Sequence, residues 1–297
     1  MPDAADRPRR ALLSPLGLPL VLAALTVLVQ VTYPLLDGRA LVASTVATVL
    51  LFCATSLSHA ALGAGARTAL LVLLVAGGIG LVAEAIGTAT GFPFGAYEYS
   101  GTLGWELLDV PVVIPLAWTM MAWPTLLLGR RLATSAVARV GARRSLGDRS
   151  TSWLRQVLTA LLGGAALASW DLFLDPQMTD AGHWMFASPT PGLPGVPGIP
   201  LTNYAGWVLV AVLMMSVLDA VVPRRTVDES VPAVMLAWTW LGSALANVAF
   251  FGRPEVALYG FVGMGLLVGP YLFLLARRRR GPVTTGPAHP HRSQSRT

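Results

Sequence analysis

Three carboxylates lie within or beside strongly apolar sequence, where titratable groups are unusual. Glu84 lies inside an apolar stretch, and Asp171 and Asp175 belong to the segment "SWDLFLDPQM". A carboxylate at the centre of a membrane helix costs about 2.5–3.5 kcal/mol on insertion scales, so each such residue is a functional candidate by default. Asp171 and Asp175 are four residues apart and therefore share one helix face.

Aromatic residues gather in the sequence next to Glu84. The stretch "GFPFGAYEYSGTLGWELLDVP", residues 91–111, contains five aromatic residues and three acids between two apolar stretches. With four histidines, the chain lacks the ligand set of a membrane di-iron enzyme. We find neither a dinucleotide-binding glycine motif after a strand nor a Gly-x-Ser-x-Gly elbow. Carboxylates, tyrosines, tryptophans and asparagine remain, and these residue types suit proton chemistry on an apolar substrate.

The elements that must position these residues are predicted to be membrane helices. The chain is 54% hydrophobic and 12% charged, whereas soluble domains carry about a quarter charged residues. Its apolar blocks have the length of about twenty residues that spans a hydrocarbon core, and helices satisfy their own backbone groups in lipid. We therefore predict an all-α polytopic bundle of about eight transmembrane helices. The predicted spans are 16–36, 41–63, 68–89, 110–129, 154–174, 204–222, 232–251 and 255–276.

The arginines predict the topology of this bundle. Residues 15–276 are expected to form one domain, flanked by disordered segments 1–14 and 277–297. Nineteen of the twenty-one basic residues, all arginine, fall on one side of the eight-span layout, and only Arg39 and Arg253 fall on the other. The positive-inside rule then places both termini in the cytoplasm of a multi-pass cell-membrane protein. Topology and contact with membrane lipids explain the basic charge without nucleic acid.

Several other polar residues have structural interpretations. We expect Asp219 to form an ion pair near Arg224 and Arg225, and His59 to make a structural hydrogen bond. The exposed loop acids are interpreted as solvated, and the glycine-rich runs as sites of close helix packing. Pro176 is expected to end the fifth helix.

Three blocks of the sequence resemble the membrane carotenoid-biosynthesis family, which includes carotenoid 1,2-hydratases and bisanhydrobacterioruberin hydratase. The blocks are "EAIGTATGFPFGAYEYSGTLGWELLDVPVVIPLAW", "WDLFLDPQMTDAGHW" and "GIPLTNYAGW". They extend over residues 84–207, and the insert "SPTPGLPGVPGIP" departs from the family pattern. The resemblance implies addition of water to a terminal isoprenoid C=C of an acyclic carotenoid, with no cofactor and no metal. It also implies a carotenoid substrate and other enzymes of the pathway as partners.

The residues fit the implied reaction. Protonation of a terminal alkene requires a protonated acid, and Glu84 and Asp171 are the candidates because burial disfavours the anion. Asp175 is the candidate general base toward water. Aromatic faces stabilise a cation by about 0.5–2 kcal/mol each. The candidate substrate-binding residues are Phe92, Phe94, Tyr97, Tyr99, Trp170 and Trp184, with Asn203 or Tyr204 orienting the water.

Two alternatives use the same sequence features. A proton-initiated carotenoid cyclase or isomerase needs the same acid and aromatic residues but excludes water. A lipid- or carotenoid-binding protein or transporter needs no chemistry, and predicts acids near the bilayer midplane rather than near one edge. A scaffold role leaves the buried acids unexplained.

The arginine distribution generates a topology prediction. Reporter fusions at Arg144 and Thr190 should report opposite sides of the membrane, because an odd number of predicted spans separates the two positions. Signals from the same side at both positions would contradict the layout and the gathering of the acids at one edge.

Overall fold

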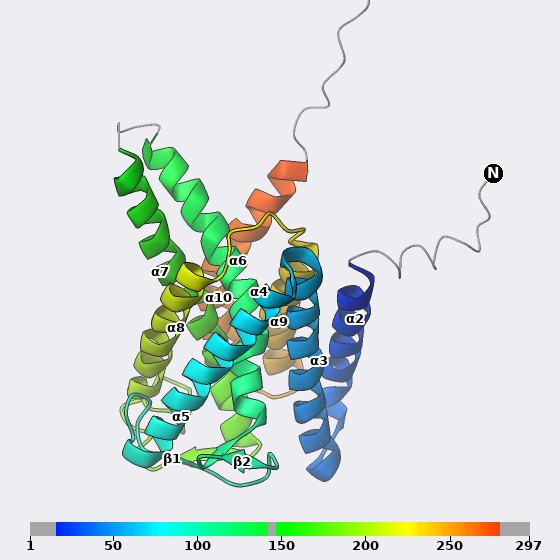
Figure 1. The fold of residues 1–297 in the computed structure, drawn as a ribbon. Coiled ribbons are helices and arrows are strands. Elements are labelled where there is room, and N and C mark those ends of the chain that lie inside the picture. The colour runs from blue at the N-terminus through cyan, green and yellow to red at the C-terminus, as the bar shows by residue number, and fades with distance from the viewer. Residues whose placement is uncertain (1–15, 142–146, 280–297) are drawn as a thin grey trace, which may run out of the picture.

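The chain folds into a bundle of long helices (Figure 1). The computed structural model describes residues 16–141 and 147–279. The all-α polytopic prediction is confirmed within these residues, and eight helical segments run along the bundle when α4, η2 and α5 are taken as one. The segments are α2 (Gly17–Thr32), α3 (Gly38–Ala64), α4 (Ala66–Val72) continuing through η2 (Leu73–Gly77) into α5 (Gly78–Thr90), α6 (Val113–Gly141), α7 (Asp148–Asp180), α8 (Leu201–Val221), α9 (Ser230–Ala249) and α10 (Pro254–Arg279).

Seven of these segments are long and apolar enough to cross a membrane, and α6 is the exception in the described part of the chain. Its sequence contains tryptophans, threonines, two prolines and three arginines, which lower its mean hydropathy. Residues 117–129 of α6 are buried, and the helix packs against α3, α5, α7, α8, α9 and α10. A helix shielded from lipid by its neighbours does not need a uniformly apolar surface.

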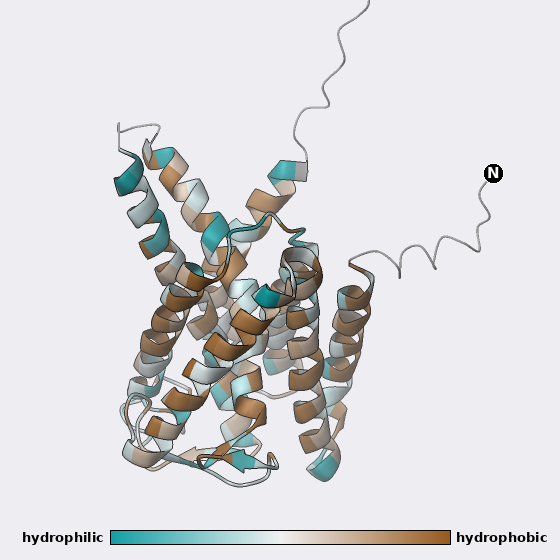
Figure 2. Ribbon diagram, viewed as in Figure 1, coloured by the Kyte–Doolittle hydropathy of each residue, from teal (hydrophilic) through white to brown (hydrophobic). Residues whose placement is uncertain are grey.

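The side surface of the bundle is apolar, as a lipid-facing surface must be. Leu28, Leu74 and Leu266 are among many exposed aliphatic side chains, and hydrophobic residues extend along the helices in Figure 2. The start of α2 and the end of α10 lie at one end of the bundle, and the connection between α5 and α6 lies at the other (Figure 1). The assignment of one of these ends to the cytoplasm is a prediction from the distribution of the arginines.

Several described helix ends differ from the predicted ones: α6 continues to Gly141 beyond the predicted span 110–129, and α7 begins at Asp148 before the predicted span 154–174. Pro176 lies inside α7 and does not end it, because α7 continues to Asp180. Hydrogen bonds support this last turn: the Thr179 hydroxyl donates to the Asp175 carbonyl at 2.7 Å, and Arg253 Nη1 donates to the Pro176 carbonyl at 2.6 Å. At the C-terminus, α10 extends through residues 277–279, which were predicted to be disordered. The predicted disordered segments 1–14 and 280–297 lie outside the described residues.

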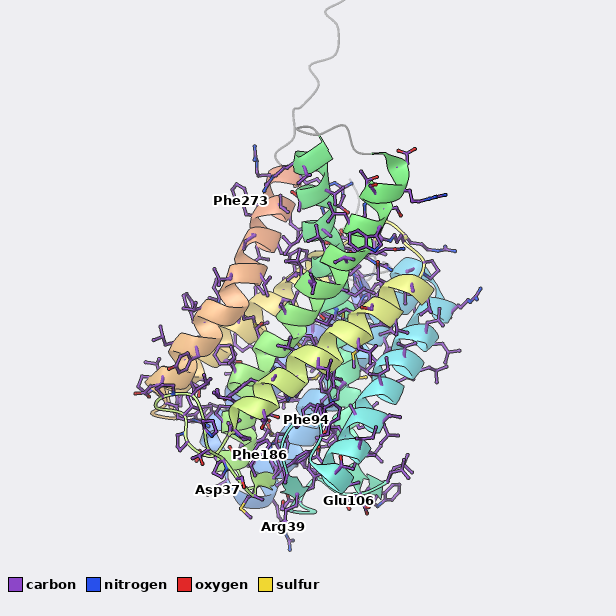
Figure 3. All side chains as sticks on the ribbon, turned by 90° about the vertical axis from the view of Figure 1, so that its left-hand side faces the viewer. Asp37, Arg39, Phe94, Glu106, Phe186 and Phe273 are labelled. Atoms are coloured by element: carbon purple, nitrogen blue, oxygen red, sulfur yellow. The ribbon has the colours of Figure 1, made fainter. Side chains whose placement is uncertain are left out.

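Two short sheets, absent from the predicted layout, form at the end of the bundle opposite the start of α2 and the end of α10. Strand β1 (Tyr97–Tyr99) pairs antiparallel with β4 (Trp184–Phe186), and β2 (Glu106–Leu107) pairs with β3 (Val110–Pro111). Gly91, with φ +78°, ends α5 in the left-handed conformation and redirects the chain toward β1. Figure 3 shows Glu106, Asp37 and Arg39 near this end and Phe273 near the other.

Glycines permit the closest helix contacts, as the sequence predicted for some of them. A Cβ atom at Gly80 would lie 2.8 Å from the Trp118 ring, and one at Gly129 would lie 2.7 Å from the Thr159 carbonyl oxygen of α7. By contrast, a Cβ at Gly78 would meet no atom within 4 Å. The packing interpretation therefore holds for Gly80 but not for Gly78.

This contrast predicts a difference in stability between two substitutions. Gly129→Ala should destabilise the protein by about 1–3 kcal/mol, because the methyl group must push α6 and α7 apart. Gly78→Ala adds the same methyl group in open space and should be neutral or stabilise by up to about 1 kcal/mol. Thermal unfolding of the detergent-solubilised proteins measures both. Equal midpoints for the two variants would show that the α6–α7 contact is looser than described.

Candidate active site

Glu84 is held by three neutral hydrogen-bond donors. It lies on α5 and is buried. Its Oε2 accepts hydrogen bonds from the Tyr97 hydroxyl at 2.5 Å and the Tyr99 hydroxyl at 2.8 Å, and its Oε1 accepts one from Trp118 Nε1 at 2.9 Å. The donors come from β1 and α6, so the Glu84 carboxyl group links the first sheet, formed by β1 and β4, to α5 and α6.

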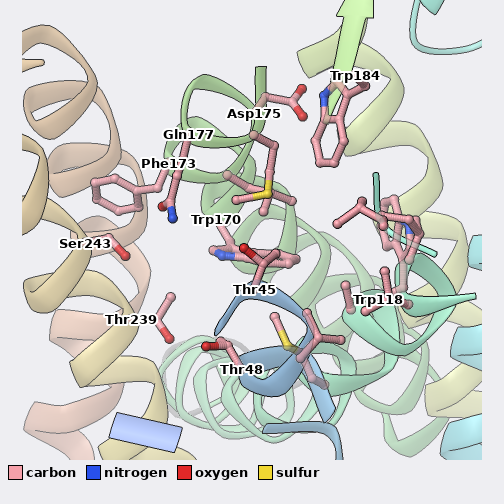
Figure 4. A pocket seen from close by; sticks show the side chains of 18 of the residues that line it. Thr45, Thr48, Trp118, Trp170, Phe173, Asp175, Gln177, Trp184, Thr239 and Ser243 are labelled. Atoms are coloured by element: carbon pink, nitrogen blue, oxygen red, sulfur yellow. The ribbon is translucent and has the colours of Figure 1, made fainter. Parts of the chain in front are cut away.

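Asp171 and Asp175 form a second cluster of carboxyl groups, which the side-chain amide of Asn203 bridges. They lie one turn apart on α7 and are both buried. Asn203, near the start of α8, donates from Nδ2 to Oδ2 of Asp171 at 2.9 Å and also to Oδ2 of Asp175. The Asp171 Oδ1 atom is buried with no hydrogen-bond partner among the described residues. Asp175 points toward the indole of Trp184 in Figure 4.

The first sheet turns its aromatic residues toward these carboxyl groups. Tyr97 faces Phe186 across the strand pair, and Tyr99 faces Trp184. Side chains alternate between the two faces of a strand, so these four residues share one face. The residues between them, Glu98 and Met185, are exposed on the other face.

Tryptophans from three helices complete an aromatic wall. Trp118 of α6 stacks on Trp207 of α8, with ring centroids 4.0 Å apart and an interplanar angle of 16°. Trp170 of α7 meets Trp207 edge-on at 5.9 Å, and Phe94 lies 6.5 Å from Trp207. Such a wall presents several electron-rich ring faces within a small volume.

The two carboxyl clusters border one cavity of about 170 Å³ (Figure 4). Its walls come from α2, α3, α5, α6, α7, α8, α9 and the first sheet. The predicted site residues that line the cavity are Glu84, Phe94, Tyr97, Tyr99, Trp170, Asp175, Trp184 and Asn203.

Three of the predicted site residues do not line the cavity. Asp171 is fully buried and is linked to Asp175 through Asn203. Phe92 is 64% exposed on the loop between α5 and β1. Tyr204 is not among the lining residues, and its buried hydroxyl has no hydrogen-bond partner within the described segments.

Sequence reasoning missed several aromatic residues that line the cavity, among them Trp118, Trp207 and Phe186. A signal for Trp207 was present, because it follows Asn203 by four residues and therefore shares its helix face. Trp118 lies well inside a predicted span, away from the interfaces where tryptophan usually acts as an anchor. Phe186 is placed by the pairing of β1 with β4, which the sequence did not reveal.

Cationic side chains interact with other acids. Arg253 was predicted to lie on the same side of the membrane as the candidate acids. Its Nη1 atom is 3.7 Å from Oδ2 of Asp180. Asp219 pairs with Arg130 at 2.7 Å and with Arg224, which confirms the expected ion pair. Within residues 16–141 and 147–279, no arginine or histidine forms a hydrogen bond or ion pair with the two carboxyl clusters.

The structural interpretation of His59 is also confirmed, since its ring bonds to the Asp228 carbonyl and to a tryptophan of α6.

The chain is similar in sequence to known proteins. The model of the carotenoid biosynthesis protein family matches residues 38–272. The chain belongs to this family. It is also similar to a protein of Haloarcula japonica named bisanhydrobacterioruberin hydratase, with 31% identity over 196 residues. This alignment covers 62% of the chain and 58% of the relative, so the chain matches less than two thirds of that protein's length. No solved structure matches the chain significantly.

In this member of the carotenoid biosynthesis family, the tyrosines beside Glu84 stay protonated. Burial raises the pKa of Tyr97, and the neighbouring Glu84 carboxyl raises it further. The pKa of Tyr99 is raised well above its usual value by the same two causes, burial first. Both phenols therefore remain hydrogen-bond donors to Glu84 over the whole physiological pH range.

His183 connects the end of α7 to the first sheet as a neutral ring. The Thr102 hydroxyl lies 2.8 Å from its Nδ1, and the His183 carbonyl accepts a hydrogen bond from Ser100 N at 3.0 Å. Its Nε2 is buried without a hydrogen-bond partner among the described residues. Burial lowers the pKa of His183 below 6.5, because the protonated ring would lose its hydration.

This environment predicts a pH-dependent stability. The unfolded chain binds the proton more readily than the folded protein does, so the His183 contribution is complete above pH 6.5 and declines as the pH falls below it. His183→Gln cannot titrate and should remove that part of the decline. Thermal unfolding midpoints between pH 8 and pH 5, measured for both proteins, test this. Parallel curves for the two proteins would show that other groups cause the decline.

Proposed function

We propose that the protein is a carotenoid hydratase, a cofactor-independent hydro-lyase that adds water to a terminal isoprenoid C=C of an acyclic carotenoid. The observation that carries the proposal is the cavity in which Glu84 and Asp175 face an aromatic wall without a cationic partner among the described residues. Family membership supports a carotenoid substrate, and the name of the Haloarcula relative supports hydration.

The acid in this proposal is the Asp171–Asp175 pair. Two carboxylates that share one amide donor and lack a cation repel each other when both are ionised, so the pair retains a proton. Asp175 lines the cavity and delivers this proton to the terminal alkene carbon. Asp171 does not line the cavity, and it acts as a positioning residue that shares the proton with Asp175. The geometry thus favours a different division of roles from the one assigned from sequence, in which Asp175 was the base.

The tertiary carbocation forms next to the aromatic wall. Trp118, Trp207 and Tyr97 offer ring faces that do not react with a cation, and each face contributes about 0.5–2 kcal/mol of attraction. The wall also excludes bulk water from this part of the cavity, which strengthens electrostatic interactions there.

Glu84 is the proposed base. Its carboxyl group is buried, and three hydrogen-bond donors offset part of the cost of holding a negative charge there. A water molecule attacks the cation and forms the C–O bond, and Glu84 accepts the proton that the oxygen loses. The alkene has then gained one proton and one hydroxide, the elements of water. A proton must pass from Glu84 back to the aspartate pair before the next turnover.

The alternatives within carotenoid chemistry differ in the mass of the product. Cyclisation or isomerisation uses the same acid and cation, but the cation then loses a proton from one of its carbon atoms. The product mass therefore equals that of the substrate. Hydration adds the mass of one water for each end that reacts.

Carboxyl-to-amide variants test the proposal in a host that produces lycopene. Asp175→Asn and Glu84→Gln keep the side-chain shape, remove the titrating group, and should reduce hydrated pigment by about 10²–10⁴-fold. Asp171→Asn should have a smaller effect and should change the pH profile, because this residue acts through Asp175. Pigment mass spectra and protein levels in the membrane are the measurements.

Glu98→Gln is the matched control, because Glu98 lies on the exposed face of β1 between the two tyrosines. It should convert pigment like the unaltered protein. Near-normal conversion by both Asp175→Asn and Glu84→Gln would end the acid–base account and favour a binding or transport role.

A further inference from the structure

The cavity has a second, polar part away from the aromatic wall. Its hydroxyl and amide groups come from α2, α3, α7 and α9, and Figure 4 shows those it labels pointing into the same space, across from Trp118 and Trp184. We call this part the hydroxyl lobe. It comprises Gln30, Thr45, Thr48, Gln177, Thr239 and Ser243.

The hydrogen-bonding capacity of the hydroxyl lobe is only partly used by the protein. Thr48 Oγ1 is buried with no hydrogen-bond partner among the described residues. Gln30 accepts a hydrogen bond from Trp238 Nε1 at 2.6 Å through Oε1, which leaves its NH₂ group for the cavity. Thr45 and Thr239 donate to carbonyls of their own helices at 3.1 Å and 2.9 Å, so their oxygens still accept.

A polyene cannot use these groups. It consists of carbon and hydrogen and offers no hydrogen-bond donor or acceptor, and a buried polar group without a partner costs about 1–3 kcal/mol. Water uses them well, because a buried water molecule typically makes about three hydrogen bonds to otherwise unsatisfied polar groups. The lobe and the two carboxyl clusters belong to one cavity, so water held in the lobe is continuous with the reaction site.

We propose that the hydroxyl lobe is a water-binding site that supplies the nucleophile for hydration. The proposal rests on the hydratase function. Each turnover consumes one water molecule, whereas the walls around the reacting carbon are mostly aromatic. Water held by the hydroxyl lobe is available when the carbocation forms, without admitting bulk water to the aromatic wall.

The fate of the carbocation reports on this supply. When water adds, a C–O bond forms and the oxygen loses a proton to carboxylate, which gives the alcohol. When water is missing, an adjacent carbon loses a proton to carboxylate, which gives back an alkene of unchanged mass. In deuterated water, that alkene can carry a deuterium atom on carbon, so it records a cation that was formed but not captured.

The experiment uses the full-length protein in lipid nanodiscs with lycopene in deuterated water. Thr48→Val and Ser243→Ala, singly and combined, remove the hydroxyl groups with little change in volume. We expect the ratio of alcohol to deuterated alkene to fall by roughly tenfold in the double variant, as for a lost water hydrogen bond of about 1.4 kcal/mol. Total deuterium incorporation should stay within about twofold of the unaltered protein, because the acid step is intact.

Two variants control for structural effects. Thr48→Ser retains the hydroxyl group and should keep the normal product ratio. Thr55→Val removes another α3 hydroxyl, which bonds to the Leu51 carbonyl at 2.8 Å and does not line the cavity, and it should also keep the ratio.

The outcomes separate this inference from the hydratase proposal. A normal product ratio in the double variant would overturn the water-site assignment while leaving hydration in place. A raised KM for lycopene with an unchanged product ratio would also overturn it, and would show that the lobe contributes to substrate packing. If the unaltered protein incorporates no deuterium and forms no alcohol, the hydratase proposal itself fails.

Discussion

The structure depends on the burial of three carboxyl groups at one end of an apolar bundle without a cationic partner among the described residues. Each ionised group would be costly in such surroundings unless neutral donors solvate it or a proton neutralises it. Two tyrosines and a tryptophan provide the donors for Glu84, and Asn203 bridges the two aspartates. These hydrogen bonds join α5, α6, α7, α8 and the first sheet around one cavity, so the polar network that satisfies the acids also shapes the site.

The small sheet of β1 and β4 brings together side chains from two loops that the helices alone would not place side by side. The residues between α5 and α6 and those between α7 and α8 are far apart in sequence, yet their strand pairing brings four aromatic residues onto one face. That face looks toward the carboxyl groups, and the opposite face carries Glu98 and Met185 into the surroundings. The unusual aromatic and acidic loop next to the membrane is therefore part of the wall of the candidate active site.

The sequence predicted the helices and many of the residues that line the candidate site, because both rest on local signals. Apolar blocks of membrane-spanning length define the helices, and an acid within such a block identifies Glu84 and Asp171 directly. The spacing of four residues between Asp171 and Asp175 predicted a shared helix face, which the structure confirms. The pairing of β1 with β4, the stacking of Trp118 on Trp207 and the bridging amide of Asn203 are contacts between distant segments, and no local pattern encodes them. Continuation of α7 past Pro176 has the same origin, since Arg253, which precedes α10, donates a hydrogen bond to the Pro176 carbonyl in the last turn of α7.

In the proposed reaction, this carboxyl-lined cavity adds solvent water across an isoprenoid double bond. The most direct measurement is the reaction of the purified protein in nanodiscs with an acyclic carotenoid in heavy-oxygen water, followed by mass spectrometry of the product. The account predicts one heavy oxygen atom in the product for each end that has reacted, located at the terminal isoprenoid unit. A converted product that contains no heavy oxygen, or a carotenoid recovered unchanged with folded protein, would contradict it.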